Sequence, residues 1–204
     1  MQPEAQIRAY IRHFASPPDA EIDELIAQGR RTLIAKGESL ARIGDVEHRI
    51  AFLHTGAVRY HVLVPETGAD ISKDFAFAPS LALSFGSAVR DEPAQVAVTA
   101  LVDCAATVWP YQTFRSMLER DRAWERFGRR AAEMLYARKE RRELSFLLRS
   151  AAERYRELLA EFPQANEVIP QHMVAAYLGI EPLSRLKRRL ARPAPPRARR
   201  KGAS

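Results

Sequence analysis

Hydrophobic residues follow two different periods along this chain, and the changes of period divide it into three parts. In residues 3–14 they recur three or four positions apart, as on one face of a helix, at Ile7, Tyr10, Ile11 and Phe14. A break at Ser16-Pro17-Pro18 follows, and a second helix is predicted from about Asp19 to Gln28. Gly29 is well placed to end this second helix.

From Arg30 to about Trp109 the pattern changes to short apolar runs separated by turn signals. Glycines recur at intervals of seven to twelve residues, at Gly37, Gly44, Gly56 and Gly68. Short strands at such regular spacing predict a β-sandwich, jelly roll or barrel. In Ala57–Val64, apolar Val58 and Tyr60 alternate with Arg59 and His61, which predicts a strand with one solvated face.

After Pro110 the helical period returns. Residues 116–162 contain no proline, and we expect a long helix over 116–148 that leaves the β part and pairs with a second copy. The contact residues follow three- and four-residue spacing: Trp124, Phe127, Ala131 and Leu135. The alternative is a helix packed on its own domain. Shorter helices are predicted at about 150–161, 171–178 and 182–191, and the Pro/Arg-rich tail at 192–204 is expected to be disordered.

The net positive charge of the chain lies at its C-terminal end. Residues 181–204 hold nine Lys/Arg and one acid, a charge of +8 against +7 for all 204 residues, so residues 1–180 carry −1. This cationic segment follows directly on the short apolar helix at 171–178. A small helix followed by concentrated positive charge indicates a polyanion-binding module. The run 138–149 (RKERRELSFLLR) is either a second DNA-contacting stripe or the solvated part of the long helix.

Several other function classes lack support in the sequence. Cys104 is the single cysteine, which excludes an intramolecular disulfide and a multi-cysteine metal site, and we predict it to be a small buried residue. The spacing of His48, His54 and His61 does not fit a jelly-roll metal site, so surface or edge positions are expected. No catalytic motif stands out, and neither an enzyme activity nor a cofactor is predicted. The N-terminus lacks the continuous apolar stretch of a secretory signal, and no apolar run is long enough for a membrane span, so we expect a cytoplasmic protein without membrane contact.

The β part and the C-terminal part together resemble the Crp/Fnr family of bacterial transcription regulators over about residues 15–190. In the β part the matching positions are Lys36-Gly37-Glu38, Gly44-Asp45, Phe52, Gly56-Ala57-Val58-Arg59, Gly68 and Phe75. In the C-terminal part, Ile169-Pro170-Gln171 and 174–180 (VAAYLGI) resemble the first helix and turn of the family's DNA-binding helix-turn-helix. Ala175 is small where two helices cross, Val174 and Leu178 face the core, and Gly179 permits the turn.

The family's effector pocket is matched only in part. Its cyclic-nucleotide-binding members carry a Phe-Gly-Glu run and, about ten residues later, an arginine after a proline; the Glu binds the ribose and the Arg the phosphate. If Pro93 marks the register, Ala94 stands at the arginine position and Ser84 at the glutamate position. Phe85-Gly86 is followed by Ser87, and Arg90 is a nearby substitute cation. A buried phosphate without its cation is costly, so the usual binding of a cyclic nucleotide is not expected.

The predicted recognition helix departs from the family as well. Relatives read Gly-Ile-Thr-Pro-Glu-Ser-Leu-Ser-Arg where this chain has Gly179-Ile180-Glu181-Pro182-Leu183-Ser184-Arg185, which is two residues shorter. Arginine reads guanine edges, whereas lysine more often contacts phosphates. The predicted DNA contacts are Gln171, Ser184, Arg185, Lys187, Arg188 and Arg189.

The sequence and the resemblance together predict an α+β protein. A cyclic-nucleotide-binding-like β-roll with N-terminal helices (1–115) is followed by a long dimerisation helix (116–148). A winged-helix-like helix-turn-helix with a truncated wing (149–191) and a basic tail (192–204) come after it. The resemblance implies a homodimeric, DNA-binding transcription regulator, with or without an effector. Double-stranded DNA and a second copy are the expected partners, and RNA polymerase is a further candidate. The alternatives are a sensor or interaction protein with a degenerate DNA-binding module and, third, a metal-dependent jelly-roll enzyme.

Overall fold

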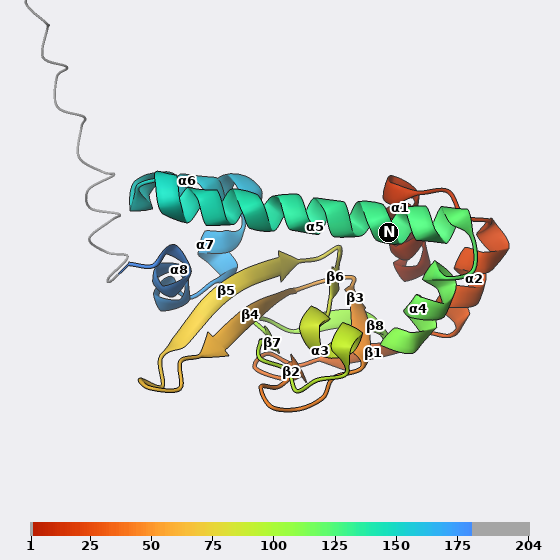
Figure 1. Cartoon of the computed structure of the whole chain (residues 1–204), viewed down its shortest axis with the longest axis horizontal. Coiled ribbons are helices and arrows are strands. Elements are labelled where there is room, and N and C mark those ends of the chain that lie inside the picture. Colours follow the sequence, from red (N-terminus) through yellow and green to blue (C-terminus); the bar gives the residue numbers. More distant parts are fainter. Residues whose placement is uncertain (1, 181–204) are drawn as a thin grey trace, which may run out of the picture.

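The computed structural model describes residues 2–180 of the chain. Two antiparallel four-stranded sheets form a β-roll, with helices at both of its ends and one long helix running along it (Figure 1). One sheet has the order β1-β8-β3-β6 and the other β2-β7-β4-β5. The strands are β1 (Arg30–Ile34), β2 (Ser39–Ala41), β3 (Arg49–Leu53), β4 (Ala57–Leu63), β5 (Asp70–Phe77), β6 (Ser80–Ala82), β7 (Ala97–Ala100) and β8 (Cys104–Pro110).

Most helices fall where the helical period predicts them, but α3 lies in the region predicted to contain only strands. The N-terminal pair is α1 (Pro3–Phe14) and α2 (Asp19–Ala27), and α3 (Phe85–Arg90) is inserted between β6 and β7. After the β-roll come α4 (Tyr111–Leu118) and the long α5 (Arg122–Leu148). The C-terminal helices are α6 (Ala151–Glu161), α7 (Ala165–Val168) and α8 (Gln171–Leu178). This α+β architecture is the predicted one, and the predicted helix at 182–191 lies outside the described residues.

Three hydrophobic clusters hold these layers together. Inside the β-roll, the inward residues of both sheets pack on one another, among them Leu53, Val58 and Val98. A second cluster joins α1, α2, α4 and the start of α5 to the sheet of β3 and β8. The third joins α6, α7 and α8 to the other sheet through Phe75 and Leu101. The C-terminal helices are therefore packed on the β-roll of the same chain.

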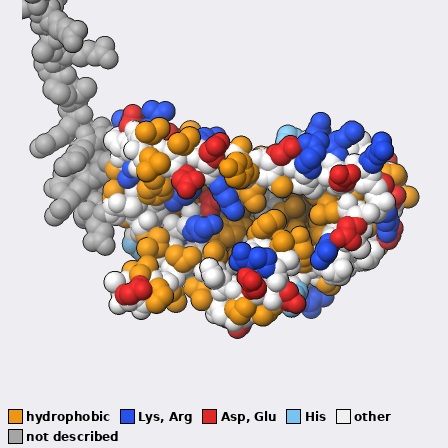
Figure 2. All heavy atoms as spheres, in the orientation of Figure 1, with side chains coloured by type: hydrophobic (Ala, Val, Ile, Leu, Met, Phe, Trp, Pro, Cys, Tyr) orange, Lys and Arg blue, Asp and Glu red, His pale blue; other side chains and the backbone are white. Residues whose placement is uncertain are grey.

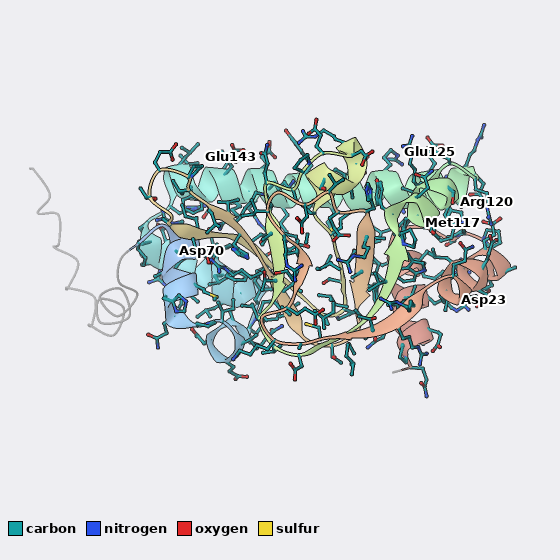
Figure 3. The ribbon with its side chains drawn as sticks, turned by 90° about the horizontal axis from the view of Figure 1, so that it is seen from below. Asp23, Asp70, Met117, Arg120, Glu125 and Glu143 are labelled. Carbon is teal, nitrogen blue, oxygen red and sulfur yellow. The ribbon has the colours of Figure 1, made fainter. Side chains whose placement is uncertain are left out.

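Helix α5 reaches from the N-terminal helices to the C-terminal ones (Figure 1). In Figure 3, Glu125 and Glu143 lie toward opposite ends of this helix, with Arg120 and Asp23 beside the first end. The predicted helix start at 116 is wrong, because α4 ends at Leu118 and a new helix begins at Arg122. The Asp121 side chain accepts hydrogen bonds from the Ala123 and Trp124 amides, which caps α5 and separates it from α4.

The predicted solvated face of β4 is not exposed. Arg59 retains 5% of its surface, and its guanidinium donates two hydrogen bonds of 2.7 and 2.8 Å to Asp70 and one to Ser72. His61 contacts Asp70 and Thr99 through its two ring nitrogens. A register shift between Tyr60 and His61 brings these β5 side chains onto the same face. The polar residues thus satisfy one another across the sheet rather than facing water.

Candidate nucleic-acid interface and effector pocket

Helix α8 has the features expected of the first helix of a helix-turn-helix. It begins after Pro170, whose ring suits the start of a helix, and it ends at Gly179 in the left-handed conformation with φ 64°. The Ile180 amide donates to the Ala175 carbonyl, and the Gly179 amide donates to the Ala176 carbonyl. This pair of bonds is a Schellman motif, so the chain turns sharply at the predicted position.

The inward face of α8 is also the predicted one. Val174 and Leu178 each retain 1% of their surface, and Ala175 is buried as well. Tyr177 packs on Phe75 of β5 with ring centroids 5.1 Å apart. Burial raises the pKa of Tyr177 to about 12, which leaves its hydroxyl protonated at neutral pH. The helix is therefore anchored to the edge strand of the β-roll.

Of the predicted DNA contacts, the structure describes only Gln171. It is the first residue of α8 and is exposed. Ser184, Arg185, Lys187, Arg188 and Arg189 lie outside the described residues.

The predicted effector pocket surrounds α3, and its two buried members carry no charge. The Ser84 hydroxyl precedes α3 and donates to the Val96 carbonyl at 3.1 Å. Ala94 retains 2% of its surface, and its backbone bonds to Gly44 and Asp45. Neither side chain supplies the cation that a buried phosphate requires or the carboxylate that binds the ribose in cyclic-nucleotide-binding relatives.

The other three pocket residues lie on the surface. Phe85 and Gly86 are exposed in the first turn of α3. Arg90 ends the helix, and its guanidinium pairs with Glu92 at 2.9 Å while 61% of the side chain stays exposed. The predicted substitute cation is therefore paired with a carboxylate at the surface of the β-roll.

A hollow separates the middle of α5 from the β-roll, and hydrophobic side chains lie on its walls (Figure 2). Where β5 meets α5, the Arg138 guanidinium contacts Asp74 at 2.7 Å and also pairs with Glu161 of α6. Burial raises the pKa of Asp74, although the nearby Arg138 charge acts in the opposite direction. Burial likewise raises the pKa of Tyr60. An anionic ligand here would have to compete with Asp74 for Arg138.

Two arginines of the run at 138–149, Arg138 and Arg142, were missed as structural residues, whereas Arg141 and Arg149 are exposed. Both sequence-based alternatives place them in solvent or on DNA, whereas Arg138 joins β5, α5 and α6. Arg142 stacks on the Tyr177 ring at 3.5 Å and donates to the Tyr177 carbonyl at 3.0 Å. The spacing of four residues between the two arginines shows that they share a helix face, but only the tertiary structure shows what lies opposite.

Two residues of the expected dimer contact lie in the core of the chain itself. Trp124 and Phe127 retain 0% and 2% of their surface and pack among α1, α2 and α4. The Trp124 indole donates to Glu21 at 2.7 Å. Ala131 packs against the same cluster, and Leu135 is half-buried. This part of the prediction needs correction: near its start α5 packs on its own domain, so a contact with a second copy cannot use Trp124 and Phe127.

Two of the three β-region histidines, His54 and His61, are buried or largely buried and not at the surface as expected; the His61 side chain is 16% exposed. His48 is exposed, but His54 retains 7% of its surface, between Gln6 at 2.8 Å and Thr107 at 2.7 Å. Within residues 2–180, no three His, Cys, Asp or Glu side chains gather as metal ligands would. No helix in this part of the chain is long and apolar enough to cross a membrane. Cys104 is buried as predicted, at the start of β8.

Comparison with known proteins identifies the fold. FixK2 from Bradyrhizobium japonicum aligns over 79% of this chain and 82% of its own, with a TM-score of 0.65 and 18% identity. A protein from Eubacterium rectale assigned to the Crp/Fnr family of transcriptional regulators aligns over 85% and 82%, with a TM-score of 0.65 and 16% identity. The catabolite activator protein of Thermus thermophilus aligns over 91% of both chains, with a TM-score of 0.54 and 20% identity. The sequence matches no protein-family model and no curated protein. The chain therefore has the fold of Crp/Fnr regulators and cyclic-nucleotide-binding proteins.

Proposed function

We propose that this protein is a homodimeric, DNA-binding transcription regulator of the Crp/Fnr type. The observation that carries the proposal is α8 itself: a buried helix that ends in a Schellman turn and leads directly into the cationic residues 181–204. A short helix followed by a sharp turn and a second, basic helix is the geometry that enters the major groove. The fold shared with FixK2 and the Thermus protein supports the same function.

The second copy is proposed to bind along an exposed apolar stripe on α5. Met134, Ala137, Leu144 and Leu148 are all exposed and follow the spacing of one helix face, which they share with the exposed Arg141. Leu148 keeps 73% of its surface, and contiguous exposed apolar surface of this kind marks an interaction site. Pairing of two such stripes would bury them in a symmetric contact and bring both α8 helices to one side of the dimer.

The effector response is proposed to differ from that of cyclic-nucleotide-binding relatives. Ser84 and Ala94 are uncharged, Arg90 pairs with Glu92, and Asp74 faces Arg138. We therefore expect no tight binding of a cyclic nucleotide, and regulation without an effector or by a ligand of another class.

Selection of genomic fragments by the purified full-length protein tests DNA binding. We expect the selected duplex to bind at least about tenfold more tightly than a scrambled duplex, because contacts with base edges add to the sequence-independent attraction of the phosphates. The variant Arg185→Ala should reduce this ratio, while Arg115→Ala, an exposed arginine paired with Glu119 on α4, should not. Equal affinity for both duplexes, with a steep salt dependence, would instead indicate a generic polyanion binder.

A further inference from the structure

The C-terminal end of α8 is held by two arginines that come from two other helices. A helix leaves its last four carbonyls without intrahelical partners. In α8 the Schellman turn satisfies two of them, at Ala175 and Ala176. The remaining two, at Tyr177 and Leu178, accept hydrogen bonds from Arg142 of α5 at 3.0 Å and from Arg154 of α6 at 2.8 Å. All four carbonyls are therefore satisfied.

Phe146 joins these two arginines into one unit. The Arg142 and Arg154 guanidinium carbons lie 4.8 and 4.9 Å from the centroid of its ring. The same ring approaches Gly179 so closely that a Cβ there would lie 3.2 Å from it. Gly179 is thus required twice, for its positive φ and for the space that Phe146 occupies. We refer to Arg142, Phe146 and Arg154 as the arginine clamp.

Electrostatics favours this arrangement. The carbonyl end of a helix carries a partial negative charge, and α8 has no basic residue of its own in its last turn. Burial lowers the pKa of Arg142, which shows that placing this cation between β5, α5 and α8 is costly. The carbonyl bond and the Tyr177 ring at 3.5 Å reduce that cost.

We propose that Arg142, Phe146 and Arg154 are positioning residues for DNA recognition: they fix the end of α8 and hence the direction in which the chain continues toward residue 181. This inference rests on the proposed DNA binding, because a direction matters only if the following segment docks in a groove. None of the three side chains needs to touch DNA. Their effect on binding should therefore appear in sequence discrimination rather than in salt dependence.

Two measurements on the full-length protein test the clamp. The first is amide exchange of residues 171–180 without DNA, which we expect to accelerate by about tenfold or more in Arg142→Ala and in Arg154→Ala, because each leaves a helix-end carbonyl unsatisfied. The second is the affinity ratio between the selected and scrambled duplexes, which should fall at least about fivefold, while the salt slope of non-specific binding stays unchanged.

Matched controls remove one exposed positive charge from the same helices: Arg129→Ala on α5 and Arg156→Ala on α6. They should change neither exchange nor discrimination. Arg142→Lys keeps the charge but loses the planar group that stacks on Tyr177, so it should restore only part of the discrimination. It also serves as a milder variant if Arg142→Ala unfolds.

Three outcomes would overturn the inference. Unchanged exchange in both alanine variants would show that the arginines do not hold the helix end. Faster exchange with unchanged discrimination would make the clamp a stability feature only. An equal loss of duplex discrimination in the Arg129→Ala and Arg156→Ala controls would show that the effect comes from net charge alone. If the unaltered protein does not discriminate between duplexes, the proposed function fails and the positioning role fails with it, whereas exchange still reports whether the clamp exists.

Discussion

At the scale of single residues, His54 illustrates how burial sets the behaviour of a titratable group. Its Nδ1 lies 2.8 Å from the Gln6 side-chain oxygen and its Nε2 lies 2.7 Å from the Thr107 hydroxyl, which joins α1 to β3 and β8. Gln6 Oε1 can only accept, so Nδ1 carries the proton and Thr107 donates to Nε2 in the neutral ring. Burial and, secondarily, the charge of Arg31 lower the pKa of His54 from its usual 6.5.

This lowered pKa predicts a loss of stability in acid. Above pH 6.5 the ring is neutral in the folded and the unfolded chain, so the stability it supports is fully present. As the pH falls below that value, the unfolded chain takes up the proton first, and the free energy of unfolding decreases by at most about 1.4 kcal/mol per pH unit. Urea unfolding at about pH 7 and about pH 5 should show a smaller decrease for His54→Gln than for the unaltered protein. An equal decrease in the variant and in the unaltered protein would show that the lowered pKa of His54 does not cause the loss of stability.

At the scale of the element, the break between α4 and α5 depends on one side chain. The helical period is continuous through residues 116–148, which predicts one helix, yet Asp121 adopts an extended conformation and caps a new one. A cap residue competes with helix continuation because its side chain satisfies the amides that a preceding turn would otherwise bind. Periodicity cannot reveal such a break, since both helices keep the same buried face.

Removal of this cap should destabilise α5. We expect Asp121→Ala to lower the free energy of unfolding by about 1 kcal/mol, because the Ala123 and Trp124 amides lose their partner. Urea denaturation measures the change. Glu133→Ala, which removes an exposed carboxylate paired with Arg129 inside the same helix, is the control and should have a much smaller effect. Equal effects of the two substitutions would mean that charge, and not the cap, matters at Asp121.

At the scale of the whole molecule, α5 connects the N-terminal helices, the β-roll and the C-terminal helices (Figure 1). Its first turns are buried in the core around Trp124, its middle pairs with β5 through Arg138, and its end holds α8 through Arg142. A change in the position of α5 relative to β5 would therefore act on the end of α8, which contacts both elements. This arrangement suits a regulator in which a second copy or a ligand acts on α5.

The exposed stripe of α5 predicts the oligomeric state. Leu144→Asp should convert a dimer into a monomer, because it places a carboxylate inside the paired apolar stripe, where removing that charge from water is costly. Tyr136→Asp introduces the same charge at an exposed position one residue from Ala137, about 100° around the helix, and should leave the dimer intact. Light scattering after size-exclusion chromatography distinguishes the monomer from the dimer for each variant. A monomeric unaltered protein, or a dimer that survives Leu144→Asp, would refute this interface.

The sequence by itself determined the local features of this protein. The two hydrophobic periods located the strand region and most of the helices, although not α3, Gly179 predicted the end of α8, and the count of charges located the basic segment at 181–204. These features depend on neighbours along the chain, so they can be derived from spacing and residue type. The tertiary structure alone decided that Trp124 packs inward, that His54 and Arg59 are buried, and that Arg142 holds the end of α8. Periodicity shows that a face is covered but not by what, and a buried polar group is stable only with partners that lie far away in the sequence.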